Sequence, residues 1–242
     1  MEERTGYILN KKGEDKEKYD RVADRYDYFE LPMEVLAFSR WRKLLFGELE
    51  KFIETGESSR SAEKLILEVG VGTGKNMPYY GAGEYVGADI SRKMLEKARS
   101  RMERLDKRVA LIQSDAELLP FRDEIFDAII STYVFCSVEN PVRGLKELYR
   151  VLKPDGRVFF LEHMRCENEV GGKILDALNP LARKFGPEIN RRTVENIQKA
   201  GFRIVEERWL MTSVFRFIVA EKGGANSSTH IAKNQTSLPL TL

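Results

Sequence analysis

Residues 66 to 80 read ILEVGVGTGKNMPYY. A short apolar run ends here in alternating glycines, Gly70, Gly72 and Gly74, and Lys75 follows directly. A buried strand that ends in a glycine-rich turn is typical of a loop whose backbone approaches a ligand closely. The spacing of the glycines therefore indicates which class of ligand the loop can serve.

The loop fails the tests for two phosphate-binding patterns. With Gly74-Lys75 as the GK pair of a GxxxxGK[ST] loop, the first glycine would fall at Val69 and the hydroxyl residue at Asn76. The dinucleotide fingerprint GxGxxG would need a third glycine at Lys75. The observed spacing is GxGxG, with Glu68 two residues before the first glycine. We therefore expect an adenosine-type ligand without a diphosphate site.

A carboxylate follows at the position where a ribose would bind. Asp89 lies 19 residues after Gly70, at the end of a second apolar run, 84–90. A carboxylate at the end of this strand can accept hydrogen bonds from a ribose diol. The alternative is that Asp89 only helps to cap the helix that is expected to begin at Ser91.

Strand and helix patterns alternate along most of the chain. Strands are predicted at 64–69, 84–90, 109–113, 126–132, 157–163, 202–209 and 213–221, and helices at 16–52, 94–105, 142–152 and 193–200. This alternation predicts an α/β fold with a mostly parallel sheet and helices on both faces. The last two strands are joined too closely for a crossover helix, so we expect them to be antiparallel.

The composition divides the chain into three expected parts. Residues 1–60 would form a helical cap, and 61–222 the ligand-binding core, in which 164–190 would be a substrate-side insertion. Residues 223–242 are rich in Ser, Thr, Asn and Gly without a period, which is typical of a disordered tail.

Charge and composition exclude several functions. The formal net charge is +2, too small to indicate nucleic-acid binding by itself. The spacing of Cys136 and Cys166 matches no zinc motif, and the sequence offers no cluster of metal ligands. No stretch reaches the roughly 18 apolar residues of a membrane span. We expect a cytoplasmic protein, and peripheral contact with a membrane stays open.

Several motifs in order resemble those of class I S-adenosylmethionine-dependent methyltransferases. The pattern ExGxGxG with Asp89 resembles their cofactor loop, and Asp115-Ala116-Glu117 followed by Leu119-Pro120-Phe121 resembles the motif beside the adenine. The runs EIFDAIIST and ELYRVLKPDGRVFFLE resemble the fourth strand and the segment that leads into the fifth.

The likeness covers about residues 19–222. It implies a Rossmann-like, mostly parallel seven-stranded sheet with an antiparallel last strand and an N-terminal helical cap, and S-adenosylmethionine as cofactor. It implies cofactor contacts by Glu68, Gly70, Gly72, Gly74, Asp89, Ile90, Asp115, Ala116, Thr132 and Tyr26.

Two residues are candidates for the chemistry of methyl transfer. His163, at the end of the fifth predicted strand, could accept a proton from an amine or thiol, or could be a hydrogen-bonded structural histidine. Tyr19, in YDRVADRYD, is placed by the resemblance on a flap near the cofactor. Tyr133 and Phe135 could offer aromatic faces to a cation, although packing in the core is the alternative.

The resemblance implies that the methyl acceptor is a small molecule or a lipid. Segments 33–53 and 172–187 combine apolar residues at helical spacing with basic ones, which is typical of membrane-surface helices and also of ordinary core helices. YDRVADRYD, ILEVGVGTG and GKILDALNPLARKFG resemble bacterial phospholipid N-methyltransferases, which methylate phosphatidylethanolamine.

Other acceptors remain open. CSVENPVRGLKELYRVLKPDGRVFFLEH and INRRTVENIQKAGF resemble membrane-associated thiol methyltransferases. A likeness to quinone-biosynthesis C-methyltransferases is weaker, because STYVFCSV departs from their pattern. A lipid amine is the first hypothesis, and a thiol or quinone precursor is the second. A cofactor-binding protein without catalysis is the third.

Overall fold

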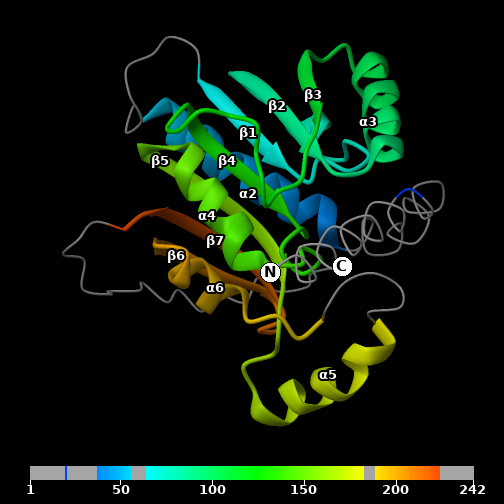
Figure 1. Ribbon diagram of the computed structural model, residues 1–242, viewed down its shortest axis with the longest axis vertical. Helices are drawn as coiled ribbons and strands as arrows, with labels where there is room; N and C mark the ends of the chain where they lie inside the picture. Colours follow the sequence, from blue (N-terminus) through cyan, green and yellow to red (C-terminus); the bar gives the residue numbers. More distant parts are fainter. Residues whose placement is uncertain (1–19, 21–36, 56–63, 183–188, 224–242) are drawn as a thin grey trace, which may run out of the picture.

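The computed structural model describes Asp20 and residues 37–55, 64–182 and 189–223. These residues form a seven-stranded sheet with the strand order β3-β2-β1-β4-β5-β7-β6 (Figure 1). The strands are β1 Leu65–Val69, β2 Glu84–Asp89, β3 Val109–Gln113, β4 Phe126–Thr132, β5 Leu152–His163, β6 Phe202–Met211 and β7 Phe215–Lys222.

The sheet is parallel from β3 to β5 and turns antiparallel at β7. β1 pairs in parallel with both β2 and β4, whereas β7 runs antiparallel to β5 and to β6. The Rossmann-like, mostly parallel fold with an antiparallel last strand is therefore confirmed. The strand order reverses between β1 and β4, and ligands of open α/β sheets bind outside the carboxyl ends of the strands at such a point.

Helices cover both faces of the sheet because successive strand residues point to opposite sides. Ile66 and Ile130 pack with α2 and α3, whereas Leu67 and Ile129 pack with α4 and α6. The helical elements are α2 Ser39–Glu54, the short 3₁₀ helix η2 Met77–Tyr79, α3 Arg92–Arg104, α4 Pro141–Val151, α5 Glu169–Ala182 and α6 Thr193–Lys199.

Helix α2 is the described part of the expected N-terminal cap. Its buried residues Trp41, Leu45, Leu49 and Phe52 recur every three or four positions, which lines one face of the helix. That face packs on the sheet, where the Phe52 and Phe159 rings lie 5.9 Å apart. Apart from Asp20, α2 and the residues that flank α2, the expected cap lies outside the described residues, as does the tail from 224.

Two helix starts follow the capping signals of the sequence. The side chain of Ser91 accepts a hydrogen bond from the Met94 N–H at 3.2 Å, as expected for the residue that begins α3. Asn140 does the same for Arg143 at 3.0 Å, and Pro141 occupies the first turn of α4.

The boundary between α4 and β5 differs from the prediction. We expected the helix to continue through Leu152 and a turn at 154–156 to precede the strand. Instead, Leu152 is extended, with ψ at 139°, and already pairs with Phe126. The register shifts between Phe126 and Ala128, so β5 begins before the proline, which lies at an irregular stretch of the strand.

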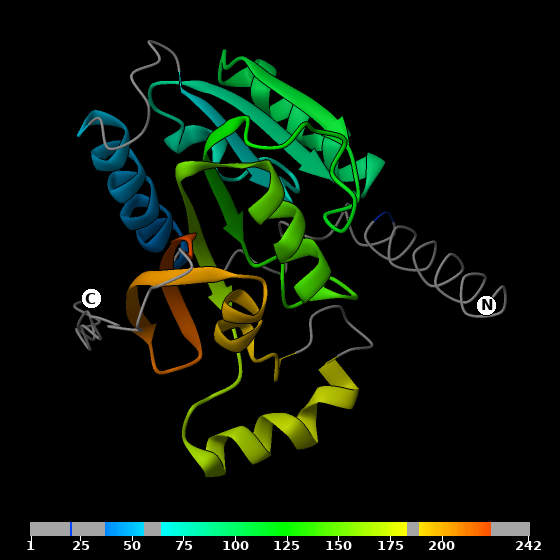
Figure 2. The same ribbon diagram turned by 60° about the vertical axis from the view of Figure 1, so that its left-hand side comes forward.

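Helix α5 stands apart from the two helical layers. It projects beyond the carboxyl end of β5 in both views (Figures 1 and 2). Its connection to the rest of the structure includes an ion pair between Arg165 and Asp176 at 2.9 Å and a hydrogen bond from the Ile189 N–H to Asn179 Oδ1 at 2.9 Å. Among the helices of the described ranges, none has the length and apolar character needed to cross a bilayer.

Candidate functional site

The glycine loop follows β1 in a conformation that few side chains could adopt. Gly70, Gly72 and Gly74 have φ angles of 69°, 53° and 78°, all in the left-handed region. The N–H groups of Gly70 and Val71 both donate to the carbonyl of Ala88, at 2.7 and 3.0 Å. These two hydrogen bonds fix the loop against β2.

Gly72 is the glycine that faces open space. A Cβ atom added there would meet no heavy atom closer than the Gly70 carbonyl at 3.9 Å. At Gly70 the same atom would lie 2.3 Å from a methyl group of Val134, and at Gly74 it would collide with Met77. The chain itself therefore requires Gly70 and Gly74, whereas the space beside Gly72 is available to a ligand.

Asp89 joins the tip of this loop to the end of β2. Its Oδ2 accepts from the Gly72 N–H at 2.8 Å, and its Oδ1 accepts from the Ser91 N–H at 2.9 Å. Burial raises the pKa of Asp89 to about 6, against the lowering effect of these bonds. A carboxylate has about four lone-pair sites, so acceptor capacity remains for a ribose diol. Neighbouring Ile90 is half-buried and accepts from Gln113 through its carbonyl.

A buried hydrogen-bond network holds the base of the loop. Glu68 accepts from the Tyr80 hydroxyl and from Asn76 Nδ2, the latter at 2.9 Å. Asn76 also donates to Thr132 Oγ1 at 3.1 Å and accepts from Arg42 at 3.1 Å. Burial raises the pKa of Glu68 to about 7. Both oxygens of Glu68 thus serve the loop, and direct contact of Glu68 or Thr132 with the cofactor stays a prediction.

Asn76 is the residue that sequence reasoning missed. In the sequence it served only to exclude a P-loop, yet in the structure it links β1, β4 and α2. Asn76 is only 2% exposed although it lies in a polar loop. No local pattern could predict this burial, because its partners Arg42 and Thr132 lie 34 and 56 residues away in the sequence.

Asp115 and Ala116 form a tight turn after β3. Asp115 Oδ1 accepts from the Glu117 N–H at 2.8 Å, and its carbonyl accepts from Leu118 at 3.0 Å. Glu117 in turn accepts from the Asn140 N–H at 2.8 Å, which ties this turn to the start of α4. The turn is fixed at the carboxyl end of β3, and its contact with an adenine stays a prediction.

Asp20 is the described residue of the YDRVADRYD segment. Its Oδ1 accepts from Ser91 Oγ at 2.5 Å and from the Lys93 N–H at 3.2 Å. A carboxylate at this position complements the N-terminus of α3. It lies beside Asp89, whose pKa it helps to raise. Tyr19 and Tyr26 themselves lie outside the described residues.

Aromatic side chains gather at the carboxyl ends of β4 and β5. Ring centroids lie 4.7 Å apart for Phe38 and Tyr133, 5.1 Å for Trp41 and Phe215, and 5.1 Å for His163 and Phe215. We call these five residues the β4–β5 aromatic cluster. It lies on the α2 face of the sheet, next to the glycine-loop network through Arg42, whose guanidinium is 6.0 Å from the Tyr133 ring centre.

His163 is a neutral imidazole in this cluster. Burial lowers its pKa to about 4. Its Nδ1 is buried and makes no hydrogen bond within the described residues. Phe135, by contrast, is fully buried and packs edge-on against Phe160, so its ring belongs to the core rather than to a ligand surface.

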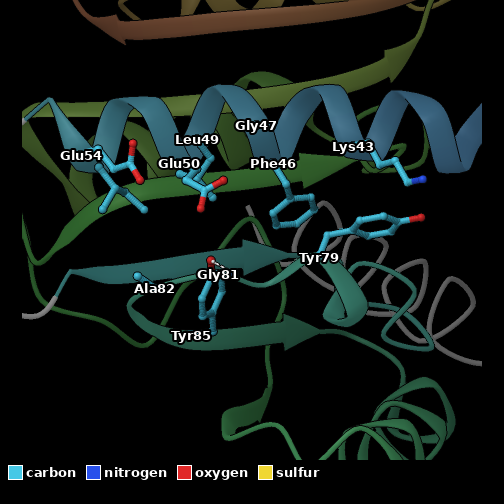
Figure 3. Close-up of a pocket in the computed structure, with 11 residues that line it drawn as sticks. Lys43, Phe46, Gly47, Leu49, Glu50, Glu54, Tyr79, Gly81, Ala82 and Tyr85 are labelled. Atoms are coloured by element: carbon cyan, nitrogen blue, oxygen red, sulfur yellow. Dashed lines mark hydrogen bonds between the residues drawn. The ribbon is translucent and has the colours of Figure 1, made fainter.

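A groove on the other side of α2 is separate from this site. It encloses about 220 Å³ between α2 and the segment from η2 to the start of β2, and Phe46, Tyr79 and Tyr85 contribute its aromatic walls (Figure 3). None of the residues expected to bind the cofactor lines it. Gly81 and Ala82 lie before β2 begins, whereas the glycine loop and Asp89 lie at the carboxyl ends of β1 and β2.

The fold and the candidate site have the features of a class I methyltransferase. A seven-stranded sheet with an antiparallel β7 carries a glycine loop after β1 and an aspartate at the end of β2. The open space beside Gly72 is compatible with a cofactor, and Gly72 and Asp89 are the residues expected to hold it. The cofactor of this class is S-adenosylmethionine, which supplies an electrophilic methyl group when bound.

Comparison with known proteins agrees with this class. Residues 67–160 match the methyltransferase domain family. Together with the fold and the relatives described below, this match indicates an S-adenosylmethionine-dependent methyltransferase. Its fold is similar to that of a S-adenosylmethionine-dependent methyltransferase from Aquifex aeolicus, with a TM-score of 0.54 and 20% identity, covering 78% of this chain and 95% of the other.

Three relatives have names that specify different methyl acceptors. The chain is 29% identical to the thiol S-methyltransferase TMT1B of Rattus norvegicus, over 75% of this chain and 78% of the relative. It is 34% identical to the demethylmenaquinone methyltransferase of Thermus thermophilus, over 60% and 63%. It is 39% identical to the phosphatidylethanolamine N-methyltransferase of Cereibacter sphaeroides, over 40% and 50%. The chain thus spans less than two thirds of the quinone and lipid enzymes.

The quinone likeness is stronger than the sequence motifs indicated. Its identity exceeds that to the thiol enzyme, although STYVFCSV departs from the quinone pattern. Similarity alone therefore does not rank the three acceptors.

Proposed function

We propose that this methyltransferase N-methylates a phospholipid amine of the phosphatidylethanolamine type at a membrane surface. The observation that carries the proposal is the exposure of apolar side chains on α5. Val170 is 68% and Leu178 50% exposed on a helix that stands off the protein body (Figure 2). A helix with this character can bury its apolar face at the boundary between lipid headgroups and acyl chains.

The position of α5 supports the same reading. It follows β5 directly, so it lies beyond the edge of the sheet where His163 ends the strand. The Arg165–Asp176 ion pair and the Asn190–Asp176 hydrogen bond at 3.0 Å restrain its orientation. If α5 lies on a membrane, a lipid headgroup can reach the β4–β5 aromatic cluster while its acyl chains stay in the bilayer.

The residues of the cluster supply what amine methylation requires. The protonated amine has no lone pair, so it must lose a proton before its nitrogen attacks the methyl carbon. His163, neutral at physiological pH, is the proposed acceptor of that proton. The rings of Tyr133 and Phe215 lie 6.4 Å apart, edge to face, and aromatic rings of this kind can hold the cation that methylation produces. The proposed contacts of Tyr19 and Tyr26 would complete the cofactor side.

The proposal is tested with methyl-labelled S-adenosylmethionine and vesicles of phosphatidylethanolamine mixed with an anionic lipid. We expect label in the lipid phase and co-sedimentation of the protein with the vesicles. The double variant Val170→Ser/Leu178→Ser should reduce both, whereas Leu105→Ser, which changes an exposed leucine at the end of α3, should reduce neither. Absence of label from the lipid, with full incorporation into another acceptor, would exclude the proposal.

A second candidate acceptor is a small thiol or a quinone precursor. The thiol S-methyltransferase TMT1B aligns with a larger part of this chain than the other relatives described above. Under this alternative, small thiols or quinols take up label without vesicles, and α5 forms a wall of the acceptor pocket. A non-catalytic cofactor-binding protein would bind S-adenosylmethionine saturably without label in any acceptor.

A further inference from the structure

The residue that follows β4 has an unusual backbone conformation. Tyr133 has a φ of 59°, in the left-handed region that a residue with a side chain rarely adopts. Its N–H donates to the Leu161 carbonyl at 2.8 Å, which joins the turn to β5. Such conformations persist where the surrounding structure imposes them, and they are frequent in functional sites. The neighbours of Tyr133 should therefore contain the group that imposes it.

The carboxyl group of Glu162 binds the chain on both sides of Tyr133. Its Oε1 accepts from Ser131 Oγ at 3.1 Å, two residues before the tyrosine. The same oxygen accepts from the N–H groups of Val134 and Phe135, at 3.2 and 3.3 Å, directly after it. One oxygen atom thus fixes the residues that flank the left-handed position.

Glu162 is buried at a cost that packing alone does not explain. Its side chain is fully buried, and Oε2 makes no hydrogen bond within the described part of the chain. Burial raises its pKa to about 7. The Cys136 thiol faces it, and burial first and Glu162 second raise the pKa of that thiol to about 12. An apolar residue would fill this space without the cost of desolvating a carboxyl group.

The turn that Glu162 fixes connects the two halves of the site. Thr132, at its start, accepts from Asn76 of the glycine-loop network at 3.1 Å. Tyr133 directs its ring onto Phe38, in the β4–β5 aromatic cluster. Glu162 and His163 are adjacent strand residues and therefore point to opposite faces of the sheet. Glu162 thus contacts the turn from the face opposite to the β4–β5 aromatic cluster.

We propose that Glu162 is a positioning residue for methyl transfer: by accepting hydrogen bonds from Ser131, Val134 and Phe135, it holds Tyr133 in the left-handed conformation that places its ring as a wall of the acceptor site. The acceptor part rests on the proposed methyltransferase reaction at the β4–β5 aromatic cluster. The backbone part stands on the geometry alone, and the two parts are tested separately.

Hydrogen exchange tests the backbone part on the full-length protein without any acceptor. In Glu162→Ala, the amides of Val134 and Phe135 should exchange at least about tenfold faster than in the wild type, because each loses its acceptor. Glu162→Gln should restore most of the protection, since an amide oxygen can still accept. Glu207→Gln is the matched control, because it alters a buried carboxylate of β6 that is paired with Arg216 of β7. It should leave the exchange of the Val134 and Phe135 amides unchanged.

Unchanged protection at Val134 and Phe135 in folded Glu162→Ala would overturn the proposal. If that variant does not fold, Glu162→Met provides the test, because it removes the acceptor while its side chain fills nearly the same volume. The Val134 and Phe135 amides should again exchange faster, and their unchanged exchange in Glu162→Met would overturn the proposal equally.

Kinetics test the acceptor part, with whichever of phosphatidylethanolamine vesicles, a small thiol or a quinol takes up label. Glu162→Ala should raise the KM for that acceptor by about tenfold while calorimetry finds the Kd for S-adenosylmethionine within about twofold of the wild type. A merely structural role would lower the folded fraction and leave KM unchanged, and that result would overturn the acceptor part. Label in a small acceptor instead of lipid would exclude the proposed lipid substrate without deciding the role of Glu162.

Discussion

The backbone N–H of Gly72 donates to Oδ2 of Asp89 at 2.8 Å. This bond joins the open position of the glycine loop to the carboxylate expected to bind a ribose. The two residues lie on successive βα turns, so the parallel pairing of β1 with β2 brings them together. Loop and carboxylate therefore form one unit, and a change in either should affect cofactor binding.

Gly72→Val should abolish binding of S-adenosylmethionine. The side chain would enter the space that a ligand requires, and a φ of 53° adds a cost of about 1–2 kcal/mol. Isothermal titration calorimetry measures the binding, and thermal unfolding confirms that the variant folds. Gly201→Ala is the control, because it introduces a side chain at a φ of 102° before β6, away from the loop. It should lose stability and keep full affinity.

Asp89→Asn should weaken the binding of S-adenosylmethionine by at least about tenfold, because hydrogen bonds to a charged acceptor contribute about 1.5–3 kcal/mol. Burial raises the pKa of Asp89 to about 6, so the wild-type carboxylate ionises as the pH rises through that value. Affinity should therefore increase from pH 5 to pH 7 in the wild type and stay flat in the variant. A pH dependence that survives in Asp89→Asn would assign the titration to another group.

The same raised pKa has an opposite consequence for folding. Between about pH 4 and pH 6 the folded state holds a proton on Asp89 that the unfolded state has released. Stability from this group is therefore lost as the pH rises through that window. Urea unfolding should find Asp89→Asn gaining stability relative to the wild type from pH 4 to pH 6.5. The reverse trend would contradict a raised pKa.

His163→Ala should reduce turnover more than cofactor affinity. Removal of a general base typically costs a factor of about 10²–10⁴ in rate. With a pKa near 4, the wild-type imidazole stays neutral through the physiological range, so its protonation should not limit activity above about pH 5. Labelled methyl transfer from pH 5 to pH 8 measures the rate. An unchanged rate in the variant would return His163 to a structural role.

Asn76→Ala should destabilise the protein by about 1–3 kcal/mol, because Glu68 loses a buried hydrogen-bond donor. The loss should be accompanied by weaker S-adenosylmethionine binding, since the base of the glycine loop depends on this side chain. Urea unfolding and calorimetry measure the two effects. Asn168→Ala, which removes an exposed bond to the Val170 N–H at the start of α5, should leave cofactor affinity unchanged.

Local patterns predicted the elements that carry the site. The strands 109–113 and 126–132 were predicted at their observed bounds. The antiparallel ending followed from the short predicted connection at 210–212, which lies at 212–214 in the structure. The predicted start of β5 at residue 157 was wrong, because the pairing of Leu152 with Phe126 overrode the proline and glycine signals at 154–156. Long-range backbone pairing is a tertiary interaction that a local window does not contain.

The sequence by itself determined the class of protein, since the glycine spacing, Asp89 and the alternation of strands and helices are all local features of the chain. Only the tertiary structure decided which groups support them. Asn76 reaches Thr132, and Glu162 reaches Ser131, because parallel strands distant in the sequence lie side by side. Burial at those contacts, which no residue experiences until the sheet is assembled, raises the pKa of Glu68 and of Glu162.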